Sequence, residues 1–224
     1  MAGASNTFDG GAAATEITPA NSGGSSGTPF ASTSGLAYSS AEVHRGPLSA
    51  TFAAGTTGSA GYTLSGTGTR WARCYAKPSE SSFSLITLNL SGGVSFRIEI
   101  DRGQAGLSQF APPFQTTYLH TAAFSPPSGW IRVELQAVNG SGTVAARLYA
   151  NPESLVHTLE LSGPVAVSGS WSGVAFGGSN SGTSPSWIDS VAWSDQGWIG
   201  PLLDDPVAAR PVSGNAAAHR AAAW

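Results

Sequence analysis

Short segments in which apolar and polar residues alternate recur along most of the chain, and they constrain its fold more than any other feature. Each has the length of a strand and a period of two, the spacing that sends alternate side chains to opposite faces of a β-strand. Gly, Pro, Ser and Asn residues that favour turns separate them, as in "NGSG" (139–142). The segments are 48–54, 70–77, 83–90, 94–100, 116–124, 130–138, 143–150, 154–161 and 187–193.

Many short strands joined by turns predict an all-β fold, with two antiparallel sheets packed as a jelly-roll β-sandwich. The chain has 224 residues, a length that suits one such domain. We expect this domain to span residues 1–201, with the Gly/Ser-rich segment 1–29 packed on it. The alternation stops at Gly200, so residues 202–224 are expected to form an irregular C-terminal extension, a candidate anchor.

The low charge of the chain argues against several classes of partner. Only 10% of the residues are charged and the net charge is −3, with no cluster of Lys and Arg. Nucleic acids and anionic membrane surfaces both need clustered cations, so neither is expected as a partner. The start "MAGASNTFDGG" lacks the basic and apolar regions of a signal peptide. We therefore expect a soluble protein made in the cytoplasm. Cys74 is the single cysteine and is expected in the core.

In several strands the alternation places charged and aromatic side chains opposite the apolar ones. If these strands share one sheet, its outer face carries a lattice of Arg, Glu and aromatic groups. Two interpretations stay open. The more ordinary one is a ladder of cross-strand ion pairs and stacked rings. The other is a carbohydrate-binding face, where rings stack on sugars and charged groups bond their hydroxyls. The candidate residues are Trp71, Arg73, Tyr75, Arg97, Glu99, Arg132, Glu134, Arg147 and Tyr149.

No catalytic residues are predicted. The stretch "EIDRGQ" (99–104) resembles the E-x-D-x-x-E signature of jelly-roll β-glucanases, and Glu99 and Asp101 match it. Its last position is Gln104, and an amide cannot serve as the general acid that glycoside hydrolysis needs. "DRGQ" is more simply a hairpin turn. "GSWSG" (169–173) has tryptophan in place of a nucleophilic serine. The chain is therefore expected not to be an enzyme.

A structural calcium site is the one cofactor that the sequence suggests. Calcium binds carboxylate and carbonyl oxygens. Asp9 and Asp189 can meet if the first and last strands are neighbours. The alternative is that each carboxylate bonds backbone amides. No other cofactor is expected, because the four histidines are scattered without metal-ligand spacing.

Three tryptophans lie close together in "WIDSVAWSDQGWIGP" (187–201). Strict alternation places Trp187, Asp189 and Trp193 on one face of the last strand. We expect Trp187 and Trp193 to close the sandwich against the N-terminal segment. Trp198 is expected to cover the open end of the sandwich. Such packing roles are common, because each large ring removes much apolar surface from water.

The order of several motifs resembles one family. These are "FDGG" within 8–30, "HRGPLSATF" (44–52), "RWARCYAK" (70–77), "GWIRVELQ" (129–136) and the stretch 187–201. Over roughly residues 5–201 the chain is similar to the concanavalin A-like (laminin G-like) jelly-roll accessory virion proteins of actinobacterial tailed phages. The family's paired acidic residues near the last strand read Asp189 and Ser190 here, which weakens the calcium prediction.

The resemblance implies a non-enzymatic virion protein: a capsid decoration protein, or a minor tail or appendage protein. It would assemble in the host cytoplasm, contact other virion subunits through its termini and display a lectin-like domain toward host-surface glycans. Displayed jelly rolls often form dimers or trimers, so a homo-oligomer is among the expectations. Two alternatives with the same fold stay open, a glycan hydrolase and a free carbohydrate-binding lectin.

Overall fold

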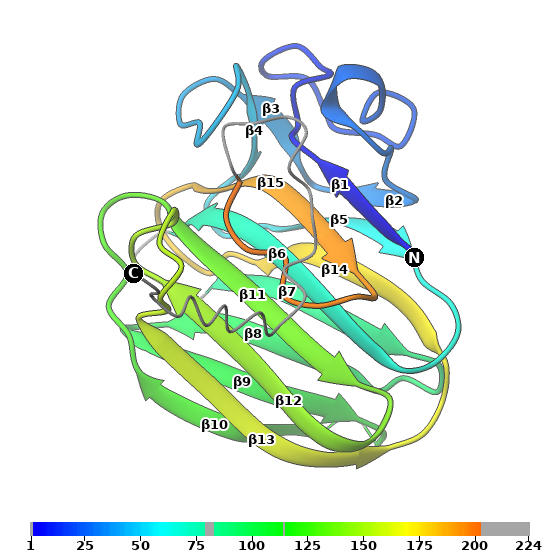
Figure 1. Ribbon diagram of the computed structural model, residues 1–224. Helices are drawn as coiled ribbons and strands as arrows, with labels where there is room; N and C mark the ends of the chain where they lie inside the picture. The colour runs from blue at the N-terminus through cyan, green and yellow to red at the C-terminus, as the bar shows by residue number, and fades with distance from the viewer. Residues whose placement is uncertain (1, 79–82, 114, 203–224) are drawn as a thin grey trace, which may run out of the picture.

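The computed structural model describes residues 2–78, 83–113 and 115–202. They form two antiparallel β-sheets that pack face to face (Figure 1). The prediction of an all-β jelly-roll sandwich is confirmed. A single 3₁₀ turn, η1 (Gly24–Ser26), is the only helical element among these residues. No described helix is long and apolar enough to cross a membrane. Apart from Leu202, the predicted C-terminal extension lies outside the described residues.

The first sheet, sheet A, has eight strands in the order β13-β12-β11-β6-β15-β4-β3, with β1 pairing along β15. Several of its strands come from opposite ends of the chain, as Figure 1 shows for β1 and β15. Its strands are β1 (Gly3–Asn6), β3 (Ala37–Ser39), β4 (Ser49–Phe52), β6 (Thr69–Lys77), β11 (Ile131–Val138), β12 (Gly140–Tyr149), β13 (Leu159–Val167) and β15 (Ser186–Ser194).

The second sheet, sheet B, has seven strands in the order β10-β9-β8-β7-β14-β5-β2. It lies behind sheet A in Figure 1. Its strands are β2 (Ser32–Ser34), β5 (Thr57–Thr63), β7 (Phe83–Leu90), β8 (Ser95–Asp101), β9 (Gln104–Ala111), β10 (Gln115–Ala123) and β14 (Trp171–Ser179).

The core lies between the two sheets and follows the period-two pattern. In β8, Phe96, Ile98 and Ile100 are buried, while the side chains between them point outward. In β6, Cys74 is fully buried between the sheets, as expected for a small core residue. Each inward side chain is removed from water, which supplies the main driving force for packing the two sheets.

The N-terminal segment is an integral part of this core. β1 pairs with β15, so the first and last strands of the described chain are neighbours. Beyond β1, Phe8 and Ile17 are 0% and 1% exposed. The Asn6 side chain accepts a hydrogen bond from the Phe8 amide and donates to the Ser22 and Thr28 carbonyls, which holds the segment against the sandwich.

Some strands differ from the sequence pattern. The segment predicted at 154–161 is a loop up to Thr158, and β13 begins only at Leu159. β5 and β14 were not expected, because their glycines dilute the alternation and glycine is depleted in strands. β9 follows the hairpin turn that "DRGQ" predicts: Asp101 pairs with Gln104, and Arg102 and Gly103 have φ angles of 46° and 81°.

A bulge in β15 overturns the prediction that Trp187 and Trp193 share one face. The packing role predicted for Trp187 is wrong, whereas Trp193 does pack on the core beside the N-terminal segment. The register shifts between Asp189 and Ala192, and Ser190 has a φ of 47°. The extra residue reverses the alternation. Trp187 lies on the outer face, with the Lys77 ammonium 5.7 Å from its ring centroid. Trp193 instead packs against the core, in register with Ala4 of β1.

Candidate functional site

The candidate residues fall on two different sheets. Seven of the nine lie on the outer face of sheet A, on the adjacent strands β6, β11 and β12. Arg132 is in register with Tyr75 on one side and Tyr149 on the other, and Glu134 is likewise between Arg73 and Arg147. The structure therefore brings these seven together: Trp71, Arg73, Tyr75, Arg132, Glu134, Arg147 and Tyr149.

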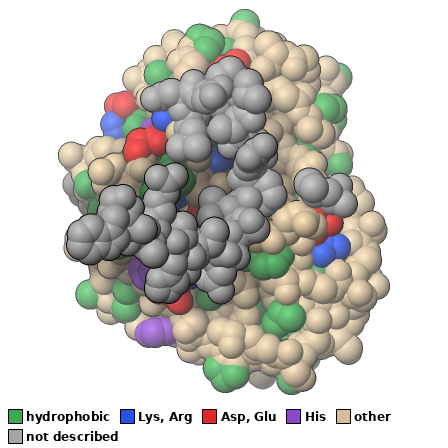
Figure 2. Space-filling model, viewed as in Figure 1, with side chains coloured by type: hydrophobic (Ala, Val, Ile, Leu, Met, Phe, Trp, Pro, Cys, Tyr) green, Lys and Arg blue, Asp and Glu red, His purple; other side chains and the backbone are tan. Residues whose placement is uncertain are grey.

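The centre of this group is buried. Arg73 is 4% exposed, and Arg132 and Glu134 are each 1% exposed. Three covering segments lie over it: residues 40–47, residues 150–158 and a strap of residues 195–202. Where Figure 2 colours the sheet A side of the molecule by side-chain type, the charged side chains form only small groups among uncharged atoms. The covering segments keep these three side chains from solvent, whereas the outward positions of β13 on the same face remain exposed.

Arg132 fastens the 150–158 segment. Its guanidinium donates to the Pro152 carbonyl at 2.5 Å and to the Ser154 carbonyl at 2.7 Å. It also lies over the Tyr149 ring, with Cζ 3.7 Å from the ring centroid, and its Nε is 3.5 Å from Glu134 Oε1. A buried cation needs such partners, because an unpaired one would be very costly.

Glu134, Arg73 and Tyr75 fasten the strap. The Gly200 amide donates to Glu134 Oε1 at 2.8 Å, and Arg73 donates to the Gly200 carbonyl at 2.9 Å. The Leu202 amide donates to the Tyr75 hydroxyl at 2.7 Å. Trp198 also belongs to the strap, and its ring centroid lies 4.1 Å from Arg147 Cζ. Trp198 therefore covers the outer face of sheet A and not the open end of the sandwich.

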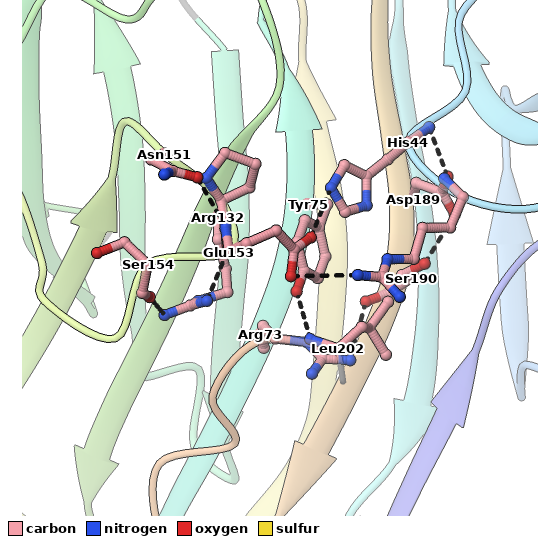
Figure 3. A network of polar contacts seen from close by, with 12 residues as sticks. His44, Arg73, Tyr75, Arg132, Asn151, Glu153, Ser154, Asp189, Ser190 and Leu202 are labelled. Carbon is pink, nitrogen blue, oxygen red and sulfur yellow. Dashed lines mark hydrogen bonds and ion pairs between the residues drawn. The ribbon is translucent and has the colours of Figure 1, made fainter. Parts of the chain in front are cut away.

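His44 and Asp189 fasten the 40–47 segment (Figure 3). The His44 ring stacks on Tyr75 with centroids 4.0 Å apart, and its Nε2 is 3.2 Å from Glu153 Oε1. The His44 and Arg45 amides both donate to Asp189 Oδ2 at 3.0 Å. Burial raises the pKa of Asp189 to about 7, and burial together with the nearby arginines lowers the pKa of His44 to about 4.

The outer face of sheet A therefore carries a polar network that binds three segments of the chain itself. Most of its donors and acceptors are directed at backbone groups and at one another. Some of its buried nitrogens, Trp71 Nε1, Arg73 Nε and His44 Nδ1 among them, have no hydrogen-bond partner among the described residues. Of the two interpretations, this arrangement matches the ladder of cross-strand pairs. The sequence did not indicate the covering segments, whose contribution is mostly backbone amides and carbonyls.

Arg97 and Glu99 lie elsewhere, on β8 of sheet B. The structure does not bring them to the other seven candidates, because β8 and β11 belong to different sheets. They face a residue that sequence reasoning missed. The Tyr118 hydroxyl of β10 donates to Glu99 Oε1 at 2.6 Å, and this bond raises the pKa of Tyr118. Tyr118 could have been found from the sequence as an aromatic residue next to threonines in "TTYLH" (116–120).

The Tyr118 ring lies against the backbone of β9 and remains 55% exposed. Position 106 beneath it is glycine, and a Cβ there would lie 2.9 Å from Tyr118 Cε1. Ser108, in register with both Tyr118 and Arg97, is buried between them. Among the described residues Arg97 makes no hydrogen bond or ion pair. An aromatic ring, a carboxylate and an unpaired guanidinium thus share one solvent-facing patch.

The two aspartates of the predicted calcium site both approach the 40–47 segment. Asp189 contacts its amides, as described, and Asp9 lies so close to Gly46 that a Cβ there would meet Asp9 Oδ1 at 2.3 Å. Asp9 Oδ2 accepts a hydrogen bond from Thr7. Both carboxylate oxygens of Asp189 already accept hydrogen bonds, whereas Asp9 Oδ1 is buried without a hydrogen-bond partner among the described residues. Because calcium needs oxygens that are free to coordinate, only Asp9 offers one here, and the calcium site stays a prediction. No group of three or more His, Cys, Asp or Glu side chains within the described part of the chain is placed to hold a metal.

Comparison with known proteins shows the fold. No protein-family model and no curated protein matches the sequence. Two solved structures of the botulinum neurotoxin serotype G binding domain are similar, each with a TM-score of 0.52. Their sequence identities are 9% and 11%, and they cover 89% and 85% of this chain. A legume lectin-like domain from Entamoeba histolytica has a TM-score of 0.48 at 7% identity, covering 68% of this chain and 86% of its own.

The chain spans about half of the toxin domains, 48% and 46% of their lengths. At such low identity the likeness to them shows the β-sandwich fold alone, because one fold supports many functions.

Proposed function

We propose that this chain is a non-catalytic, lectin-like carbohydrate-binding domain that a phage virion displays. The observation that carries the binding function is the patch on sheet B: the exposed Tyr118 ring, held by Glu99 beside the unpaired Arg97. An exposed ring offers a flat apolar surface to the face of a sugar. A carboxylate and a guanidinium beside it accept from and donate to sugar hydroxyls.

The ring is held in place before any ligand arrives. The bond to Glu99 and the contact with the β9 backbone fix its orientation, so binding would order few additional groups. The sheet A candidates do not compete for this role, since the protein's own covering segments occupy that face.

The proposal of a non-catalytic domain rests on the hairpin beside the patch. Asp101 and Gln104 are paired at the end of this hairpin. In the E-x-D-x-x-E signature of jelly-roll β-glucanases, the position of Gln104 is a glutamate. The Gln104 amide has no acidic proton to donate to a leaving group. Release of reducing sugar from any polysaccharide by the purified protein would contradict this part of the proposal and favour a hydrolase.

The binding function is tested by replacing the ring. We expect the wild-type protein to bind one or more glycans on an array, and Tyr118→Ala to bind them about two- to tenfold more weakly, since an aromatic stacking contact contributes roughly 0.5–1.5 kcal/mol. Titration calorimetry gives the affinities. Tyr75→Phe is the matched control. Tyr75 is buried on sheet A, so the loss of its hydroxyl group should leave the glycan affinity unchanged. If Tyr118→Ala bound glycans as tightly as the wild type, the patch would be excluded as the binding site.

The virion role rests on the order of motifs along the sequence. Purified particles should contain the protein by mass spectrometry, and cryo-electron microscopy should place the sandwich on their surface. Deleting residues 203–224 tests whether the C-terminal extension is the anchor, in which case the truncated protein is missing from particles. A protein that binds glycans but is absent from all particles would instead be a free lectin.

A further inference from the structure

The patch at Tyr118 lies at one end of a longer feature of sheet B. Seven outward-facing residues, one from each strand, are in register across the whole sheet. Side chains that are opposite one another in a sheet share one face. In spatial order this row consists of Tyr118, Ser108, Arg97, Thr87, Ala175, Gly61 and Ser32.

Beyond Arg97 the row contains only small side chains. Thr87 and Ala175 are partly exposed and Ser32 is exposed, while Gly61 has no side chain and is buried. We call these seven residues the track. Since neighbouring strands are about 4.8 Å apart, its six intervals extend about 29 Å. An open track of this length has room for several units of a linear chain, and no bulky side chain in the row divides it.

A second row runs beside the track and is also polar and small in its middle. Thr63, Gly173, Asn89 and Ser95 are in register there. Asn89 and Thr63 supply an amide and a hydroxyl, groups that can both donate and accept hydrogen bonds. The middle of the sheet thus offers neutral hydrogen-bonding groups beside the track.

The charges on this end of the sheet balance. Arg97 and Arg102 are matched by Glu99 and Asp101, all on β8 or its hairpin. An anionic sugar would meet Glu99 and Asp101, and a cationic one would meet Arg97. A neutral sugar with adjacent hydroxyls can accept from Arg97 and donate to the free oxygen of Glu99. Like-charge contacts cost binding free energy, so the balance favours a neutral ligand.

We propose that the track binds an internal stretch of a neutral linear polysaccharide lying across the strands. One sugar unit stacks on Tyr118 and bonds Arg97 and Glu99, and the following units lie over Thr87 and Ala175. This inference rests on the proposed carbohydrate-binding function and adds the ligand class and the mode of binding.

Titration calorimetry with defined oligosaccharides tests the ligand class. The probes are cello-, xylo- and arabino-oligosaccharides of one to six units, with alginate oligosaccharides as anionic and chitosan oligosaccharides as cationic comparators. We expect the affinity for at least one neutral series to rise tenfold or more from one to six units. Alginate and chitosan hexamers should bind at least tenfold more weakly than the best neutral hexamer.

A blocked track tests the mode of binding. Ala175→Trp places a large ring in the middle of the track, far from Tyr118. It should abolish the rise in affinity with the number of sugar units, while the affinity for the shortest oligosaccharide that binds stays unchanged. Ala166→Trp, on an exposed position of β13 in sheet A, is the matched control and should bind like the wild type. Thermal unfolding of both variants checks that the sandwich remains folded.

The outcomes separate this inference from the function on which it rests. Binding that depends on Tyr118 but does not rise with length, or that Ala175→Trp does not change, would overturn the track and leave the carbohydrate-binding function standing. Preference for alginate or chitosan would overturn the neutral class. If none of the probes binds and the glycan array is also negative, the proposed function fails together with the track.

Discussion

Arg132 is the largest fully buried side chain of the described structure, and its charge is balanced only by groups that it touches. Its partners are two loop carbonyls, the Glu134 carboxylate and the face of Tyr149. At the scale of the residue, this site shows why the centre of the outer face of sheet A is closed. Arg132 is 1% exposed, because the loop whose two carbonyls it binds lies over it.

Replacing Arg132 should therefore destabilise the protein strongly. Arg132→Ala leaves the Glu134 carboxylate buried without its cation, and breaking such a pair costs about 3–5 kcal/mol. We expect that loss in the free energy of unfolding measured with urea. Lys77→Ala is the control, since the Lys77–Glu42 pair is partly exposed and such pairs contribute at most about 1 kcal/mol. Similar losses for the two variants would argue against a buried network.

Asp189 gives the stability a defined pH dependence. Its pKa is raised from 3.8 to about 7, so below about pH 4 it is protonated in both the folded and unfolded states. As the pH rises, the unfolded chain ionises first, and the contribution of Asp189 to stability is lost up to about pH 7. Relative to Asp189→Asn, the wild type should lose on the order of 4 kcal/mol between pH 4 and 7. Urea unfolding of both proteins across this range measures the difference.

His44 acts in the opposite direction and provides the check. Its pKa is lowered from 6.5 to about 4, so its contribution is complete above about pH 6.5 and is lost as the pH falls. The charged groups around this pair are Arg45, Arg73 and Glu153. Removing His44 with His44→Gln should therefore change the pH slope with the sign opposite to Asp189→Asn. Equal slopes in all three proteins would contradict both shifts.

At the scale of the element, the β8–β9 hairpin is strained at one position. Arg102 has a φ of 46°, a left-handed conformation that asparagine adopts more readily than arginine. Arg102→Asn creates the Asn-Gly pair favoured in two-residue turns of this kind. We expect it to stabilise the protein by about 0.5–1 kcal/mol, by analogy with other substitutions that relieve turn strain. That gain corresponds to a rise of about 1–4 °C in the melting temperature, measured by calorimetry.

The hairpin also has an internal control. Gly103 has a φ of 81°, a left-handed conformation that is unfavourable for alanine, so Gly103→Ala should lower the melting temperature. If Arg102→Asn left the melting temperature unchanged while Gly103→Ala lowered it, the strain at Arg102 would be too small to matter.

The sequence was informative within each strand and much less so between strands. Alternation placed Ala72 and Cys74 inward and Arg73 outward, because a strand has only two faces. It could not tell which strands share a sheet, so Arg97 was grouped with Arg132 although their strands lie in different layers. Strand pairing depends on contacts between residues far apart in the chain, which a local period does not encode.

Two other features left no trace in the pattern. The bulge at Ser190 shifts the face of every later residue in β15 by one position. The strap binds through the Gly200 amide and carbonyl, and backbone groups are the same in every residue. Tyr118 could have been singled out as an aromatic residue in a threonine-rich strand, but its partner Glu99 is apparent only once β8, β9 and β10 are in register.

At the scale of the whole molecule, the N-terminal segment and the sandwich form one folding unit. Phe8 and Ile17 are as deeply buried as residues of the central strands. Phe8→Ala should lower the free energy of unfolding by about 3–5 kcal/mol, the usual cost of truncating a core phenylalanine. Urea unfolding provides the measurement, with a single transition expected for both proteins.

Glu16→Ala, at an exposed position of the same segment, should change stability by less than about 0.5 kcal/mol. A small effect of Phe8→Ala, or a separate first transition in the wild type, would mean that the segment folds independently of the sandwich.

The strap on sheet A also determines how the domain would respond to a mechanical load. Its contacts lie in series along the chain: Leu202 with Tyr75, Gly200 with Glu134 and Arg73, and Asp195 with Ala2. A force applied to the chain at Leu202 would load these contacts one after another, and contacts that open singly yield at lower force than strands sheared together. The strap would peel away first. The sandwich, together with the face that carries Tyr118, would stay folded while the load is absorbed.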